Sequence, residues 1–316
     1  MNSDMEDVGV LLDYEVDLAI GSDENNFECK ISTEGHCCEA GFFLYLEGTE
    51  YGGIVDSIEA DTANKEITYS GRTWHGMLDS KVICPDPGED YLILSGEANA
   101  VLGTLIARLG LSSLFAASEE SSGFTISSFK MDRYISGYKG IKKMLKKHGA
   151  KLVIKFIDGH VVLSTEAIVD YSRDEQFDTD QIEFNIKKNF KPVNHCICLG
   201  KGDLHERMVI HLFADSSGNI SETQSLTGLD EVSIVYDYSS AESSEELIKG
   251  GTELIQDSWN SDEVKFDFDS NNEAYDIGDI VGATEMVTGL FVAAEITKKI
   301  VTINKGQTTI NYKVGE

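Results

Sequence analysis

Alternating apolar and polar residues predict short β-strands throughout the first 85 residues. The apolar side chains recur at every second position in Tyr14–Leu18 and Phe27–Ile31, and similar runs follow at Phe42–Leu46, Ile54–Ile58 and Ile67–Tyr69. Several short strands at about 8–12-residue spacing are typical of a small antiparallel barrel or sandwich. We therefore expect a first β-barrel domain over residues 1–86.

The pattern becomes helical after Pro87. Apolar residues from Ala98 to Leu109 recur at three- and four-residue intervals, which predicts a helix that ends at Gly110. A second helix is predicted from Gly137 to His148, and Asp158-Gly159 predicts the turn of the β-hairpin that follows. We expect an α+β module over residues 87–172.

Strand patterns return after residue 173, with one helix among them. Ser243 and Glu246 form a capping box at the start of an apolar stripe that runs toward Trp259. The order of strand types in residues 39–71 recurs weakly in residues 276–312, which favours a second, related barrel within residues 173–316 and allows strand exchange between the barrels. The predicted fold is α+β and mainly β, with two related antiparallel β-barrel domains, an inserted α+β module and one further helix.

Charge and composition narrow the function. The 316 residues include 55 Asp and Glu against 26 Lys and Arg, a net charge of -29. Such acidity disfavours broad nucleic-acid binding, which depends on Lys and Arg at phosphates. The N-terminus has acids where a signal peptide has basic residues, and no apolar run approaches the ~20 residues of a membrane span. We expect synthesis in the cytoplasm and no stable membrane insertion.

One segment of this acidic chain is basic. Seven lysines and no acid occur from Lys139 to Lys155, most of them on the second predicted helix. A solvated helix face is the ordinary interpretation of such a run. Docking to an acidic partner surface is the functional alternative, and phosphate binding is a third.

Metal binding has one candidate cluster. His195, Cys196 and Cys198 lie together, with His205 and His211 downstream, and zinc prefers Cys and His ligands. Residues two apart on a strand share a face, so the two cysteines can equally pack inward while His195 points away. The spacing matches no zinc finger, and none of the six cysteines forms a Cys-x-x-Cys pair. We expect free thiols, no metal and no other cofactor.

No catalytic residue is assigned. The chain has no Gly-x-Ser-x-Gly elbow, no His-Glu-x-x-His helix and no phosphate-binding Gly-x-x-x-x-Gly-Lys loop. His75 and Cys84 are near in sequence but have no supporting third group. We expect a protein that is not an enzyme and has no cofactor-binding site.

Several segments together resemble a family of tailed-phage proteins. These segments are Glu47–Asp56, Tyr69–Gly76, Pro192–His195, Cys198–Gly202, Val209–Leu212 and Asp276–Val281. The family comprises the tail-tip and baseplate hub proteins of siphophages and prophages of Gram-positive bacteria. The resemblance extends from about Tyr14 to Val314, and none of its motifs is catalytic.

The resemblance implies a virion structural protein of the tail tip, similar to the trimeric two-barrel hub of contractile phages. Three chains would form a pseudo-sixfold ring that joins the tail tube to a spike or fibre and lets DNA and tape-measure protein pass. The implied partners are the protein itself, the distal tail or tail-tube ring, the tape-measure protein, and a spike, fibre or tail-associated lysin. An acidic lumen would repel the DNA phosphates.

Two alternatives stay open. Some hub proteins carry a C-terminal peptidoglycan hydrolase, and because the chain ends at Glu316 we expect none here. A hub-associated hydrolase activity would need a carboxylate pair on a concave surface. A receptor-binding or carbohydrate-binding module at the tail tip is the other alternative.

Overall fold

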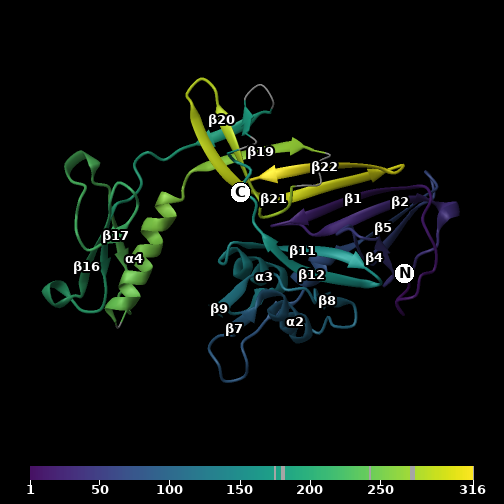
Figure 1. Ribbon diagram of the computed structural model, residues 1–316, viewed down its shortest axis with the longest axis horizontal. Coiled ribbons are helices and arrows are strands. Elements are labelled where there is room, and N and C mark those ends of the chain that lie inside the picture. The colour runs from purple at the N-terminus through teal and green to yellow at the C-terminus, as the bar shows by residue number, and fades with distance from the viewer. Residues whose placement is uncertain (174–175, 179–181, 242, 271–274, 316) are drawn as a thin grey trace. The chain divides into compact units, whose positions relative to one another are not determined.

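The computed structural model describes residues 1–173, 176–178, 182–241, 243–270 and 275–315. The chain forms two compact units (Figure 1). Unit 1 consists of Met1–Phe184, Lys265–Ala283 and Ala293–Glu316, and unit 2 consists of Asn185–Val264 and Thr284–Val292. The predicted boundaries near residues 86 and 172 stay a prediction.

A large antiparallel sheet dominates unit 1 and joins the two ends of the chain. Strand β1 pairs with β2 on one side and with β21 on the other, so that Leu18 lies opposite both Phe27 and Val301. Figure 1 shows the purple N-terminal strands beside the yellow C-terminal ones. In spatial order the strands are β19 (Glu263–Asp269), β22 (Gln307–Val314), β21 (Leu290–Asn304), β1 (Tyr14–Gly21), β2 (Asn26–Ser32), β5 (Glu66–Thr73), β4 (Gly52–Asp61) and β3 (Phe43–Tyr45).

The predicted mainly-β, α+β fold is confirmed. The described strands, however, do not form two closed barrels. A strand has only two hydrogen-bonding edges. Because β21 occupies one edge of β1, strands β1 to β5 cannot close on themselves. Within the described residues the strand pairs follow an open path, and strands predicted for separate barrels share one sheet. The short strands β13 (Gln176–Asp178), β14 (Phe184–Lys187) and β20 (Ile280–Glu285) complete this sheet.

The predicted α+β module packs its helices on a small sheet of its own in unit 1. Helix α2 (Ala98–Arg108) buries the predicted apolar stripe, and α3 (Gly137–Lys146) buries Ile141, Met144 and Leu145. The predicted hairpin joins β11 (Ala150–Ile157) to β12 (His160–Ala167). The remaining elements are α1 (Trp74–Asp79), β6 (Val82–Ile83), β7 (Ile93–Glu97), β8 (Phe115–Ala117), β9 (Thr125–Lys130) and β10 (Ile135–Ser136).

Unit 2 is a small sheet covered by one helix. Helix α4 (Ser244–Trp259) begins as predicted, because the Ser243 hydroxyl accepts a 3.3 Å hydrogen bond from the Glu246 amide. Its inner face contributes Leu247 and Ile255 to the core. The strands, in spatial order, are β17 (Ile220–Ser221), β16 (Val209–Ala214), β15 (His195–Leu199) and β18 (Ser233–Asp237). In the described parts of both units, no helix is long and apolar enough to cross a membrane.

Candidate functional site

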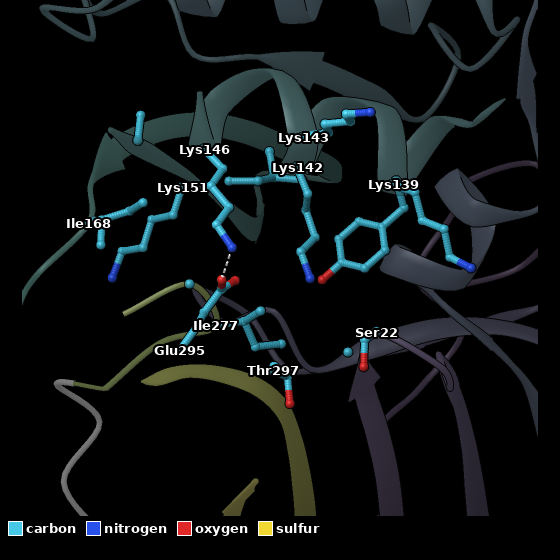
Figure 2. A pocket seen from close by; sticks show the side chains of 15 residues that line it. Ser22, Lys139, Lys142, Lys143, Lys146, Lys151, Ile168, Ile277, Glu295 and Thr297 are labelled. Atoms are coloured by element: carbon cyan, nitrogen blue, oxygen red, sulfur yellow. Dashed lines mark hydrogen bonds and ion pairs between the residues drawn. The ribbon is translucent and has the colours of Figure 1, made fainter. Parts of the chain in front are cut away.

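Unit 1 contains a lysine-lined pocket of about 440 Å³. Helix α3 supplies one wall, and the end of β1 and the middle of β21 supply the other. Figure 2 shows Lys142 and Lys146 extending toward the side of the pocket that holds Glu295 and Thr297 of β21, whereas Lys143 points away from that side. The charged residues that line the pocket are Lys139, Lys142, Lys143, Lys146, Lys151 and Glu295.

The spacing of the α3 lysines places them on one side of the helix. Lys139, Lys142, Lys143 and Lys146 recur at three- and four-residue intervals, which align side chains on a helix. The buried Ile141 keeps the other side of α3 in the core. We call these four lysines the lysine face. Like charges at this spacing destabilise a helix by about 0.2–0.5 kcal/mol per pair, so this arrangement opposes helix stability.

Carboxylates neutralise part of the lysine face. Lys143 pairs with Asp132, and Lys146 pairs with Glu295 across the pocket. The Lys142 ammonium lies 5.1 Å from the centre of the Tyr138 ring. Lys139 is exposed and has no carboxylate partner among the described residues. The pocket therefore keeps positive charge at its open side.

A buried ion pair lies at the floor of the pocket. The Lys151 ammonium is 2.7 Å from the carboxylate of Asp279, whose side chain is wholly buried. The same carboxylate accepts backbone hydrogen bonds from Val169 and Asp276, each of 2.9 Å. Its charge is therefore fully compensated, which a buried ion requires.

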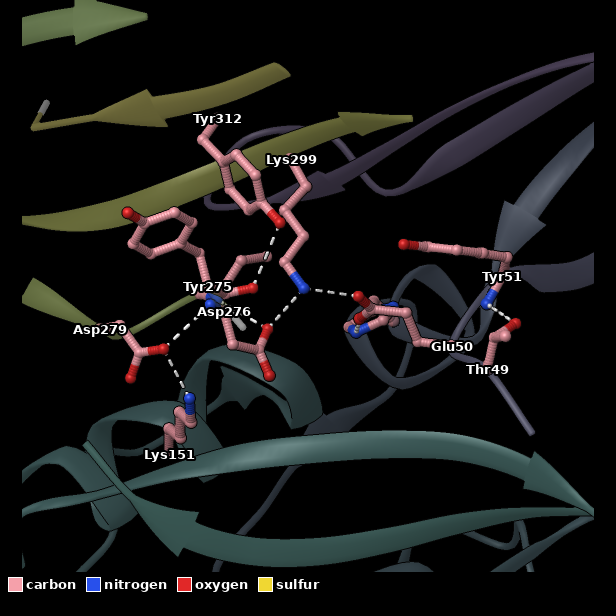
Figure 3. A network of polar contacts seen from close by, with 11 residues as sticks. Thr49, Glu50, Tyr51, Lys151, Tyr275, Asp276, Asp279, Lys299 and Tyr312 are labelled. Atoms are coloured by element: carbon pink, nitrogen blue, oxygen red, sulfur yellow. Dashed lines mark hydrogen bonds and ion pairs between the residues drawn. The ribbon is translucent and has the colours of Figure 1, made fainter. Parts of the chain in front are cut away.

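A second buried ion network adjoins the first, as Figure 3 shows. The Lys299 ammonium lies 2.6 Å from Glu50 and 2.6 Å from Asp276, and His75 lies 3.3 Å from Glu50. Burial alone would raise the pKa of Glu50, but the charge of Lys299 and the contact with His75 lower that pKa to about 2. Burial opposes the charge of Lys299, but its two carboxylates raise its pKa well above the ordinary value. Burial also raises the pKa of Asp276.

These contacts join three parts of unit 1 that are distant in sequence. Glu50 precedes β4 near the N-terminus, Lys151 begins β11 in the α+β module, and Lys299 lies on β21. Because each charge is paired and none is more than 22% exposed, the network favours a fixed junction rather than proton transfer to a substrate. We missed these roles in the sequence, although Glu50, His75, Asp276 and Asp279 lie in motifs that carry the family resemblance.

The pocket differs from a glycosidase site. Such a site uses two carboxyl groups that flank the substrate. Among the described residues that line this pocket, Glu295 is the only carboxylate, and it is paired with Lys146. Glu50 and Asp276 do lie together, but the Lys299 ammonium lies 2.6 Å from each of them and neutralises their charge.

The candidate metal ligands in unit 2 are divided between the two faces of β15. Cys196 and Cys198 are buried against α4 with their sulfurs 3.6 Å apart, and burial raises the pKa of Cys198 to about 12. On the other face, His195 Nε2 lies 2.8 Å from His211 Nδ1. His205 is exposed in a separate turn. The described residues contain no cluster of three or more such side chains that could hold a metal ion.

His195 has a second polar contact. Its Nδ1 lies 2.6 Å from a carboxylate oxygen of Glu231 and 3.1 Å from the Ser233 hydroxyl. The ring also stacks on Phe213, with 4.4 Å between ring centres. These contacts orient the imidazole along the sheet surface.

No protein-family model and no curated protein matches this sequence. Its fold is similar to that of two solved prophage tail proteins. A prophage tail protein, gp18, from Listeria monocytogenes has a TM-score of 0.53 and 12% identity, covering 96% of this chain and 90% of that one. The 43 kDa tail protein of prophage MuSo2 from Shewanella oneidensis has a TM-score of 0.50 and 10% identity, covering 95% and 92%. A tail protein from Neisseria meningitidis has a TM-score of 0.47 and 11% identity, covering 96% and 91%.

Proposed function

We propose that this chain is a structural hub protein of a phage, prophage or phage-like tail. Three copies form a pseudo-sixfold ring at the tail tip, between the tail tube and a spike or fibre. The observation that carries the proposal is the likeness of fold to two prophage tail proteins over 95–96% of this chain and at least 90% of each of theirs. The family resemblance of the sequence motifs points the same way.

The construction of unit 1 supports a role that bears mechanical load. The N-terminal and C-terminal strands share one sheet, and the buried ion networks join that sheet to the α+β module. Local opening at either end of the chain therefore has to break contacts elsewhere in unit 1. A ring subunit under tension during injection needs such coupling.

A role without catalysis agrees with the described side chains. The charged pocket lacks a pair of carboxylates, and the buried carboxylates are neutralised by lysines. In the proposed ring, the net charge of -29 lets DNA pass without adhesion, because acidic walls repel phosphate. The ring binds the tail-tube ring on one side and a spike, fibre or lysin on the other, and the tape-measure protein passes through it.

The experiment that tests the proposal is the solution mass of the purified protein by light scattering, at low and moderate salt. We expect a mass of three chains. We also expect this trimer to become more stable when salt screens the repulsion between the acidic copies. Electron microscopy of that species should show a ring with a central pore. A monomer at high concentration in both salts, together with hydrolysis of purified cell wall, would replace the hub proposal by the hydrolase alternative.

A further inference from the structure

The lysine face is an exception to the charge of the whole chain. Residues 139–155 hold seven of the 26 basic residues and none of the 55 acidic ones. The rest of the chain therefore carries 19 basic against 55 acidic residues. A second copy of this chain therefore offers a large excess of acidic over basic residues outside this segment.

The structure gives this segment a shape as well as a charge. The lysine face lines one wall of the 440 Å³ pocket, and Lys139 stands at it without a carboxylate partner among the described residues. Lys139 and Lys142 repel each other at three-residue spacing on α3, whereas Lys143 and Lys146 are already paired with carboxylates. A carboxylate-bearing segment that enters the pocket would relieve that repulsion.

We propose that the lysine face and its pocket bind an acidic loop of a second copy of this chain. The inference rests on the proposed self-association and identifies one surface of that contact. A closed ring of identical subunits needs a head-to-tail contact, in which two different surfaces of the same protein meet. The lysine face can serve as one of these two surfaces. Its positive charge attracts the acidic residues of the neighbouring copy, and few residues of that copy repel it.

The geometry favours carboxylates of a protein over free phosphate. The wall opposite α3 contains Glu295, already paired with Lys146, and its carboxylate would repel a small dianion held in the pocket. The described lining has no arginine, the side chain suited to bidentate phosphate binding. Single carboxylates on a loop can each pair with one lysine and leave the Lys146–Glu295 pair in place.

Zero-length carbodiimide cross-linking tests this contact, because it joins a lysine to a carboxylate only where the two touch. The cross-linked protein is separated into monomer and multimer bands on a denaturing gel, and the linked peptides are identified by mass spectrometry. We expect Lys139 to be joined to acids only in the multimer bands. The Lys143–Asp132 and Lys146–Glu295 pairs are internal controls that must appear in the monomer band.

Charge reversal provides the second test. The double variant Lys139→Glu, Lys142→Glu should associate at least about tenfold more weakly than the unchanged protein, because like charges then face each other across the contact. The double variant Lys249→Glu, Lys305→Glu has the same net charge but alters exposed residues outside α3, and it should associate much as the unchanged protein does. Circular dichroism establishes that both variants are folded.

The outcomes separate the two proposals. A trimer without inter-copy links at the lysine face, or equal association of the two double variants, overturns this inference and leaves the hub proposal standing. A monomer under all conditions overturns this inference, and a monomer that also hydrolyses purified cell wall overturns both. Protection of Lys139 and Lys142 from cross-linking by millimolar inorganic phosphate, with the trimer intact, would assign the pocket to phosphate and also overturn the inference.

Discussion

Replacing Lys299 by methionine should destabilise unit 1 strongly. The Lys299 side chain is 6% exposed, and its ammonium is 2.6 Å from both Glu50 and Asp276. Methionine keeps the length of the side chain but removes the charge, so two largely buried carboxylates, 15% and 22% exposed, lose their shared cation. Removing one partner of a buried ion pair typically costs about 3–5 kcal/mol, because the remaining charge is left uncompensated.

The neighbouring strand offers a matched control. Lys313 on β22 pairs with Asp267 at 3.1 Å, and both side chains are well exposed, at 39% and 52%. Exposed pairs contribute about 0–1 kcal/mol, since water and salt screen them. Lys313→Met should therefore change the free energy of unfolding by less than about 1 kcal/mol.

Urea unfolding measured by tryptophan fluorescence can isolate unit 1. Trp74 is buried in the core of unit 1, whereas Trp259 lies in unit 2. In a Trp259→Phe background, the fluorescence change reports on Trp74 alone. If Lys299→Met lost no more stability than Lys313→Met, the buried network would not be the junction that we infer.

Three further predictions follow from pKa values and packing. Since the pKa of Glu50 is lowered from 4.5 to about 2, the stability that Glu50 contributes should be complete above pH 4.5 and be lost as the pH falls toward 2. Urea titrations across this range should show the free energy of unfolding decline, and Glu50→Gln should reduce that decline. Gly251→Ala should cost unit 2 about 1–3 kcal/mol, because the added carbon overlaps the Cys198 sulfur, whereas the exposed Glu253→Ala should be nearly neutral by Trp259 fluorescence. A disulfide reagent should react quickly with two of the six thiols in the folded protein, and with the other four only on unfolding, because only two are exposed; the exposed two are Cys37 and Cys84.

Local elements were predictable because their signals are local. Each of three correctly predicted features depends only on residues that are close together in the sequence. These features are the apolar stripe of α2, the turn at Asp158-Gly159 and the cap at Ser243. Helix α1 was missed because its six residues are too few to show a helical period. The lysine face was also visible in the sequence, since only the spacing of residues on a helix was needed.

The partners of the strands were not predictable in the same way. Alternation specifies which side chains share a face, but it does not specify which strand lies alongside. The pairing of Leu18 with Val301 spans nearly the whole chain, and it is this pairing that opens the predicted barrel. Strict alternation also fails at Lys298 and Lys299, which are both buried, because a register shift follows Ile296 on β21.

Salt should affect assembly of the proposed ring in two opposite ways. Repulsion between copies of net charge -29 is long-ranged, and the screening length falls from about 30 Å at 0.01 M salt to about 10 Å at 0.1 M, so association should first strengthen. Lysine–carboxylate contacts act over a few ångströms and weaken only when the screening length approaches about 3 Å, near 1 M. The association constant should therefore pass through a maximum. The neutral variant Lys139→Gln, Lys142→Gln should keep the rise and lose most of the fall, whereas a steady rise in the unchanged protein would mean that apolar surfaces alone hold the copies together.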